Sequence, residues 1–415
     1  MKPERVKRKT WQYPWGYKES FLIILELVLL GFIFEVLTKG RGFPGIHWPA
    51  NLVTGLLLIA LIILIHLLFR NHPFVKWLSS IPAAISAISF YTFLVLILGF
   101  LPQGNPHVHP VIRILGLYHI QNSWTLAISS LYLLTSLGLV ILRRSSALNR
   151  KNIGFLMNHA GMWIVLAAAG LGSGDIQRLT MELHEDSGFI NIAMGQSRTV
   201  QELPFSVKLI DFHIDEYTPK IGIVDRNTGE LISHKGFTYI SAEEGDITEF
   251  DNWTIRINRF IENALDDSAQ YIPSDTHGAA PAVLVNIQNN VTSVVIEEWL
   301  SCGSYLVPAK YIQLDNQHIM IMLNPEAERY RSDIVIDSGQ KQDTVAIEVN
   351  KPYNIKGYNI YQLSYDERMG KWSKTSIFEI VKDPWLTIVY VGIFMLLAGA
   401  AYIFLIGNEQ TKEIK

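Results

Sequence analysis

A histidine lies inside an apolar segment that is long enough to cross a lipid bilayer. The apolar part runs from about Leu52 to Phe69, and His66 lies close to its C-terminal end. A run of this length is typical of a membrane-spanning helix. Because polar side chains are costly in lipid, an ionisable one marks a candidate functional site. A neutral imidazole can bind a metal ion, or it can form a structural hydrogen bond to a neighbouring helix, so these two roles are open to His66.

A second histidine, His159, lies in the apolar stretch "LMNHAGMW". The small residues Ala160 and Gly161, with those at 167–170, would allow another helix to approach closely. Metal ligation, helix packing and proton handling are all open to His159. Nothing in the spacing shows whether His66 and His159 face each other.

The other histidines give weaker signals. His107 and His109 in "GNPHVHP" would share one face of an extended segment, with His119 soon after. Two histidines alone are a weak metal signal, because transition-metal sites usually have three or four ligands, so we expect an interfacial loop. Five more histidines show no ligand spacing, and we expect them to be ordinary residues of a β domain: His184, His213, His234, His277 and His318.

Two carboxylates lie in the first apolar run. Glu26 and Glu35 are nine residues apart, which is about 900° of helix, so they should point to opposite faces. We expect Glu35, near the outer end, to reach water. We expect Glu26 to face the helix bundle, either as a hydrogen-bond partner or as a functional carboxylate.

Six apolar runs predict a polytopic α-helical membrane protein. They cover about 21–38, 52–69, 82–101, 123–142, 154–172 and 385–406. Basic residues cluster in 2–9, 70–76 and 143–151, whereas the alternate loops hold only Lys39, Arg41 and Arg113. The positive-inside rule therefore predicts cytoplasmic tails at 1–20 and 407–415, a five-helix region at 21–172 and a sixth helix at 385–406.

The segment 173–384 is predicted to be a large, predominantly β domain outside the cytoplasm. Alternating stretches such as "FSVKLIDFHID", "NWTIRINRFI", "AVLVNIQ" and "SDIVIDS" are typical of short strands. Residues 174–384 hold 32 acidic and 18 basic side chains, so this domain is acidic. An acidic surface would accelerate encounters with basic proteins, although it would also simply favour solubility.

Cysteine usage excludes two chemistries. The chain has a single cysteine, Cys302, and no CxxC or CxxCH motif. It can therefore form no internal disulfide, and it cannot attach haem to itself through such a motif.

Several stretches, in order, resemble one family. They are "LPQG…LGLYHIQNSWTLAISSLYLL" (101–134), "FLMNHAGMWIVLAAAGLGSGD" (155–175), "LPFSVKLIDFHIDEY" (203–217), "VNKPYNIKGYNIYQLSYD" (349–366) and "KDPWLTIVYVGIFMLLAGAAYIFL" (382–405). This order resembles the ResB (CcsB) family of cytochrome c biogenesis proteins over about residues 82–406. The two helices ahead of residue 81 are similar to those of the extended type of this family.

The resemblance implies a subunit of the System II cytochrome c synthase in the bacterial cytoplasmic membrane. The implied partner is a separate CcsA-type, tryptophan-rich membrane subunit. Together they would carry haem b outward as a transported substrate and attach it to reduced CxxCH motifs of apocytochrome c. Thiol-reducing proteins are further candidate partners, and no nucleic acid is expected.

The resemblance also assigns roles to the two membrane histidines. It makes His66 a candidate axial ligand of the haem iron and His159 a supporting haem-binding residue. Arg70, Lys76 and His72 lie near the same boundary and could meet the haem propionates. We expect no catalytic side chain from this chain, because a synthase chiefly positions the reacting groups.

A second interpretation remains open. The chain could be a membrane-anchored structural or sensory protein whose outer domain binds a partner without haem. Loss of all c-type cytochromes on deletion would favour the synthase subunit, and intact cytochromes would favour the anchor.

Overall fold

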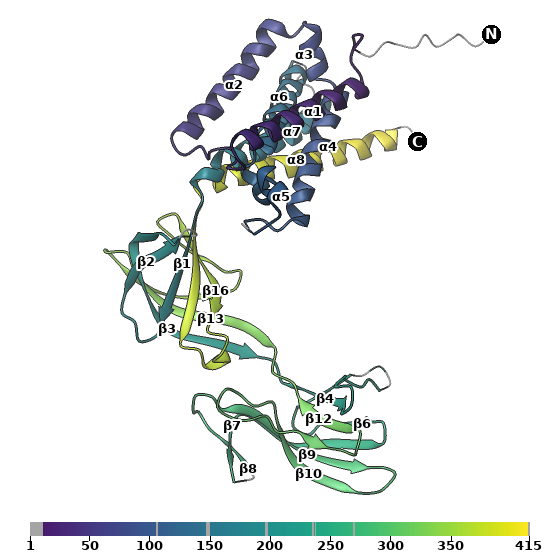
Figure 1. Ribbon diagram of the computed structural model, residues 1–415, viewed down its shortest axis with the longest axis vertical. Coiled ribbons are helices and arrows are strands. Elements are labelled where there is room, and N and C mark those ends of the chain that lie inside the picture. Colours follow the sequence, from purple (N-terminus) through teal and green to yellow (C-terminus); the bar gives the residue numbers. More distant parts are fainter. Residues whose placement is uncertain are drawn as a thin grey trace, which may run out of the picture. The chain divides into compact units, whose positions relative to one another are not determined.

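The chain folds into a helical unit and a β unit. The computed structural model describes residues 11–104, 107–146, 150–195, 198–234, 236, 238–268 and 270–413. The helical unit comes from residues 1–176 and 383–415, and the β unit from residues 177–382. Figure 1 shows both units.

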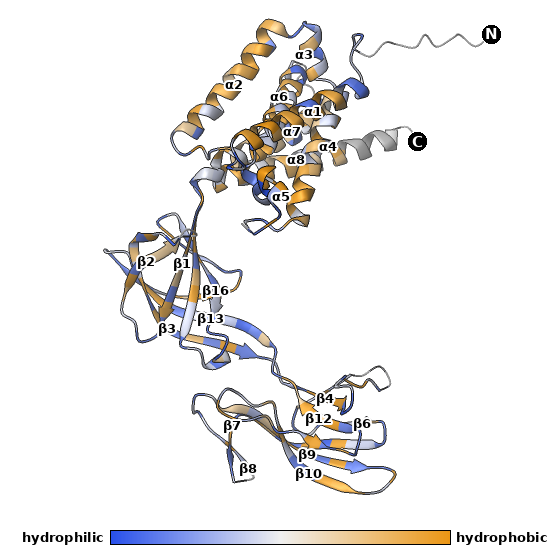
Figure 2. Ribbon diagram, in the orientation of Figure 1, coloured by the Kyte–Doolittle hydropathy of each residue, from blue (hydrophilic) through white to orange (hydrophobic). Residues whose placement is uncertain are grey.

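Six long helices of the helical unit are apolar enough to cross a membrane, counted over the residues that the structure describes. Figure 2 shows their hydrophobic character. They confirm the six predicted spans and identify a membrane protein. They are α1 (Tyr17–Leu37), α2 (Ala50–Phe69), α4 (Ile81–Phe100), α6 (Trp124–Ser145), α7 (Arg150–Gly172) and α8 (Leu386–Glu413).

Two short helices were not expected. They are α3 (Pro73–Leu78) and α5 (Pro110–Ile114), and each begins at a proline. In both, the preceding histidine caps the helix, because a ring nitrogen accepts the backbone N–H two residues on. His72 Nδ1 accepts from Phe74 at 3.3 Å, and His109 Nδ1 accepts from Val111 at 3.4 Å. His109 therefore has a local structural role at the start of α5.

Helices α7 and α8 pack with unusually close backbones. A Cβ added at Gly161 would lie 2.5 Å from the Leu396 nitrogen and 2.6 Å from the Gly392 oxygen. One at Gly399 would lie 2.8 Å from the Gly154 oxygen. Small residues allow such approach in membranes, where packing and interhelical hydrogen bonds drive association. Asn158 adds one such bond, since its Nδ2 donates to the Leu396 carbonyl at 3.2 Å.

Helix α1 packs through one stripe of residues. Its buried side is formed by Glu19, Ser20, Ile24, Val28, Gly31 and Glu35. A Cβ at Gly31 would lie 2.5 Å from the Thr125 Cα, so Gly31 lets α6 approach. Glu35 is fully buried and accepts the Trp124 N–H, the first of α6, at 2.7 Å.

The two carboxylates of α1 do lie on opposite faces, but their environments are the reverse of the prediction. Glu35 does not reach water, because it is buried as a cap of α6. Glu26 does not face the bundle, because it is exposed. The prediction used only the position of each carboxylate along the membrane span. Which face of α1 is buried is instead set by Gly31 and Glu35, which contact the N-terminus of α6.

The β unit has two lobes. The first lobe is one antiparallel sheet of eight strands in the order β14-β13-β3-β2-β1-β17-β16-β15. Its alternating apolar residues, such as Met181 and Leu183 of β1, form one core. The strands are β1 (Gln177–His184), β2 (Ile190–Gly195), β3 (Val200–Glu216), β13 (Ala327–Asp337), β14 (Gln342–Glu348), β15 (Tyr353–Ile355), β16 (Tyr358–Tyr365) and β17 (Thr375–Lys382).

The second lobe packs a five-stranded sheet against a four-stranded one. The five-stranded sheet contains β6 (Ile247–Phe250), β7 (Trp253–Asp267), β8 (Gln270–Pro273), β9 (Ala280–Asn289) and β10 (Val295–Ser301). The four-stranded sheet contains β4 (Lys220–Asp225), β5 (Tyr239–Ser241), β11 (Ile312–Gln313) and β12 (His318–Met322). The predicted β-rich domain is thus confirmed as a large antiparallel structure.

The α7–α8 contact gives a matched test on one helix. Gly161→Ala should destabilise the helical unit by about 1–3 kcal/mol, because the new methyl group would overlap the α8 backbone. Gly170→Ala is the control, because a Cβ there would meet nothing within 4 Å. Thermal unfolding of the detergent-purified protein measures both. Equal melting temperatures would contradict the close packing.

Candidate functional site

His66 lies on the side of α2 that packs against the rest of the helical unit. The buried residues of α2 are Asn51, Gly55 and Ile62, which share one helical face. His66 follows Ile62 by four residues on that face and is half-buried. By contrast, Leu67 and Leu68 beside it are 67% and 64% exposed. The imidazole therefore points toward other helices, in agreement with a functional or packing role.

The N-terminal end of α2 and the C-terminal end of α7 are joined by one carboxylate, that of Asp175. Its oxygens accept the Trp48 backbone N–H at 2.8 Å and the Asn51 Nδ2 at 2.6 Å. They also accept the Trp385 Nε1 at 2.8 Å, just before α8 begins. Asn51 Nδ2 additionally donates to the Leu171 carbonyl at 3.0 Å. Three helix ends are thereby fixed at one point.

Helices α2 and α7 are antiparallel, and glycine contacts further along them define their register. A Cβ at Gly55 would lie 2.9 Å from Leu171 Cδ1. Further along, Ile62 of α2 and Trp163 of α7 both meet Gly138 of α6, where a Cβ would lie 3.1 Å from Ile62 Cδ1 and 3.3 Å from Trp163 Nε1. Residue numbers rise along α2 as they fall along α7.

This register brings His66 and His159 to the same level of the bundle. His66 lies four residues after Ile62, and His159 lies four residues before Trp163. Because the helices run antiparallel, both steps lead in the same direction, by about 6 Å. Trp163 Nε1 donates to the Leu134 carbonyl of α6 at 2.9 Å, which fixes the side of α7 on which Trp163 and His159 lie. The sequence spacing left this relation open.

The imidazole of His159 is held in one tautomer. Its Nδ1 lies 2.9 Å from the Phe155 carbonyl oxygen, which can only accept, so Nδ1 carries the proton. In the neutral ring Nε2 then keeps its lone pair, the arrangement typical of metal-ligating histidines. The ring also stacks on Phe155, with centroids 3.7 Å apart. These contacts hold the ring of His159 in place and leave the Nε2 lone pair free of the hydrogen bond to Phe155.

A cation that sequence reasoning missed lies beside His159. The Arg144 guanidinium lies 4.9 Å from the Phe155 ring centroid, on whose ring His159 also stacks. Arg144 also donates to Asn152 Oδ1 at 3.2 Å. From the sequence alone, Arg144 is only one of the basic residues at 143–151 that the positive-inside rule uses. Arg70 and Lys76 are exposed near the end of α2, while His72 uses its Nδ1 to cap α3.

Other histidines have identifiable partners. His119 Nε2 donates to the Gly40 carbonyl at 2.7 Å. Within the described part of the chain, one trio of possible metal ligands has its ligand atoms within 4.8 Å of one another: Asp211, His213 and Asp333. Arg331 already donates twice to Asp333, at 3.0 and 2.9 Å, so we assign this trio to a surface charge network.

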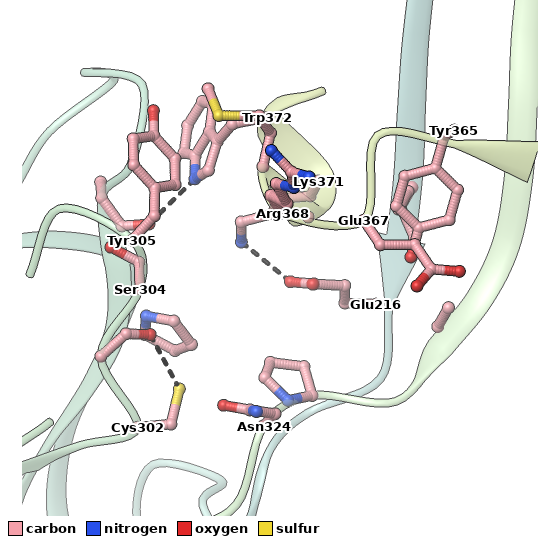
Figure 3. A pocket seen from close by; sticks show the side chains of 18 of the residues that line it. Glu216, Cys302, Ser304, Tyr305, Asn324, Tyr365, Glu367, Arg368, Lys371 and Trp372 are labelled. Carbon is pink, nitrogen blue, oxygen red and sulfur yellow. Dashed lines mark hydrogen bonds and ion pairs between the residues drawn. The ribbon is translucent and has the colours of Figure 1, made fainter. Parts of the chain in front are cut away.

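The β unit contains a cavity of about 510 Å³ between its two lobes (Figure 3). Lys371 pairs with Glu216 across it at 2.9 Å, and both side chains are mostly buried. Trp372 Nε1 donates to the Ala279 carbonyl at 3.0 Å, which connects the first lobe to the second.

Cys302 lines this cavity as a neutral thiol. Burial raises the pKa of Cys302 to about 11, and the Glu216 charge adds to the effect. The thiol donates to the Gly303 carbonyl at 3.6 Å. Because only the thiolate is a nucleophile, Cys302 is a poor candidate for thiol–disulfide exchange.

The high pKa of Cys302 predicts a pH profile. Below pH 11 the rate of alkylation by iodoacetamide should rise about tenfold per pH unit, because the thiolate fraction does. At pH 8 the native protein should react about a hundredfold more slowly than the unfolded chain, in which the thiol has an ordinary pKa of about 8.5. Mass spectrometry of the modified peptide measures both rates. Similar rates in the two states would show a reactive thiolate instead.

Comparison with protein families finds a match over segments that contain three of the five quoted stretches, 155–175, 203–217 and 349–366. The family model of the ResB-like family matches residues 149–230 and 283–376. The first segment contains α7 with His159 and runs through β4, and the second runs from β9 into β17. His66 and α2 lie outside both segments. No curated protein matches the chain. Because the match joins α7 to most of the first β lobe and part of the second, the chain belongs to the ResB-like family.

Proposed function

We propose that this chain is the ResB-like subunit of a System II cytochrome c synthase. It carries haem b across the bacterial cytoplasmic membrane and helps to position it for thioether attachment to CxxCH motifs of apocytochrome c. A separate CcsA-type, tryptophan-rich membrane subunit completes the enzyme. Membership of the ResB-like family supports the broader role in cytochrome c biogenesis.

The observation that carries the haem proposal is the antiparallel register of α2 and α7. It brings two intramembrane histidines to one level, and one of them keeps its Nε2 lone pair for a metal. Haem iron is commonly held by axial histidines. His66 is the proposed axial ligand, and His159 the supporting ligand on the facing helix. The second axial ligand in the complete synthase can come from His159 or from the partner subunit.

Haem also carries two propionates, which require cations. Arg144 is stacked on Phe155 next to His159, and Arg70 follows His66 by one helical turn. Both lie at the end of the bundle that the positive-inside rule assigns to the cytoplasm. With both chain termini in the cytoplasm, haem would enter near these residues and leave toward the β unit outside.

The attachment chemistry makes modest demands on this chain. Each cysteine thiol adds across a haem vinyl group, so that sulfur bonds one carbon and hydrogen the other. The subunit holds haem and peptide in position, which can supply a large share of such a barrier. The neutral thiol of Cys302 agrees with a positioning role. Thiol-reducing proteins would keep the incoming cysteines reduced.

An absorbance spectrum of the chain co-purified with its partner tests the proposal. Wild type should show a Soret band and sharp reduced-state bands. His66→Ala should lose or shift these bands, and His159→Ala should weaken them. His109→Ala is the matched control, because this histidine of the same unit only caps α5. Identical spectra in all four proteins would remove both histidines from haem binding.

The acidic β unit gives a second expectation. Its excess of acidic side chains should attract basic apocytochromes. Raising the salt concentration from about 0.05 to about 0.5 M should slow association roughly tenfold or more, since screening shortens the Debye length. Stopped-flow binding measures this rate, with an apocytochrome of reversed surface charge as the control. A rate independent of salt would contradict electrostatic docking.

A further inference from the structure

An ionisable side chain, Glu26, is exposed in the middle of a membrane-spanning helix. Helix α1 runs from Tyr17 to Leu37, so Glu26 lies near the centre of the span. It is exposed, and the structure shows no hydrogen bond or ion pair between it and any residue that it describes. The buried stripe that includes Gly31 and Glu35 already packs against α6 from the opposite side.

Lipid cannot satisfy this carboxylate. Hydrocarbon offers no hydrogen-bond donor, and intramembrane carboxylates almost always face protein or a water-filled cavity. The helices of this chain leave Glu26 exposed, so its partner must come from outside the described chain. Between membrane helices, polar side chains commonly act as interhelical hydrogen-bonding groups.

The residues around Glu26 form a packing stripe. Leu29 is 51% exposed, Ile33 55% and Leu37 70%, and they follow Glu26 at steps of three and four residues. This spacing aligns them on one face of α1, together with half-buried Leu22. A single polar residue in an apolar seam is a device that fixes the partner and the register of paired helices.

We propose that the Leu22–Glu26–Leu29–Ile33 face of α1 binds a transmembrane helix of a second, different membrane chain, which presents a hydrogen-bond donor to Glu26. This rests on the proposed function, which requires a tryptophan-rich partner subunit, and it names the surface that receives it. A second copy of this chain is the poorer occupant. A two-fold contact through this face would bring Glu26 against its own carboxylate, and like charges repel.

Photo-crosslinking in membranes that contain both chains tests the surface. A photoreactive amino acid at Leu29 or Ile33 should crosslink to the tryptophan-rich chain. The same group at Leu57, which is 64% exposed on α2, is the matched control and should crosslink at least fivefold less. Mass spectrometry identifies the crosslinked chain. Equal crosslinking from all three positions, or crosslinks from α1 to a second copy, would overturn the assignment.

Recovery of the partner tests the role of Glu26 itself. Glu26→Leu should lower the amount of partner recovered with the purified chain at least fivefold. Glu26→Gln should retain most of it, because an amide oxygen still accepts a hydrogen bond. Because Leu suits an exposed membrane face, Glu26→Leu should fold, which its melting temperature checks. Full recovery with Glu26→Leu would refute the inference and leave the proposed function intact. No recovery with wild type would refute both.

Discussion

The helical unit depends on the carboxylate of Asp175. It accepts hydrogen bonds from the Trp48 backbone, the Asn51 amide and the Trp385 indole, so α2, α7 and α8 share one anchoring point. Its side chain is only 10% exposed, so this carboxylate is compensated mainly by protein donors. Hydrogen bonds to a charged group are stronger than neutral ones, and they are directional. The relative heights of α2 and α7 follow from this point.

From that anchor, packing continues toward the other end of the bundle. Gly55 admits Leu171, and Gly138 admits both Ile62 and Trp163. His66 and His159 come next, one turn further along each helix. On its opposite side α7 is fixed by the glycine contacts with α8. The two histidines thus belong to helices that are positioned by many small contacts, as the haem site that we propose would require.

Much of this arrangement could be predicted from the sequence, and some could not. Length and hydropathy are local properties, so the six spans and the β-rich unit were predicted, and quoted motifs identified the family. Which face of α1 is buried depends on the contact between Gly31 and Thr125, which are distant in the sequence. The sequence alone therefore predicted an exposed Glu35 and a buried Glu26, whereas Glu35 is buried and Glu26 is exposed. The alignment of His66 with His159 similarly depends on Asp175, whose partners are far away in the chain. Arg144 could have been singled out only by knowing that Phe155 lies beside it.

The glycine contact of α7 with α8 also has a consequence for biosynthesis. The whole β unit, residues 177–382, is encoded between these two helices. At typical rates of translation, about 200 residues take roughly 10–40 s to make. During that time α7 is in the membrane and the surface around its Gly154 and Gly161 is uncovered, because α8 has not yet been synthesised. Any chaperone, insertase or other nascent helix that binds at Gly154 and Gly161 must leave before α8 can dock. Because α8 is synthesised so late, it must compete with such occupants for its binding surface on α7.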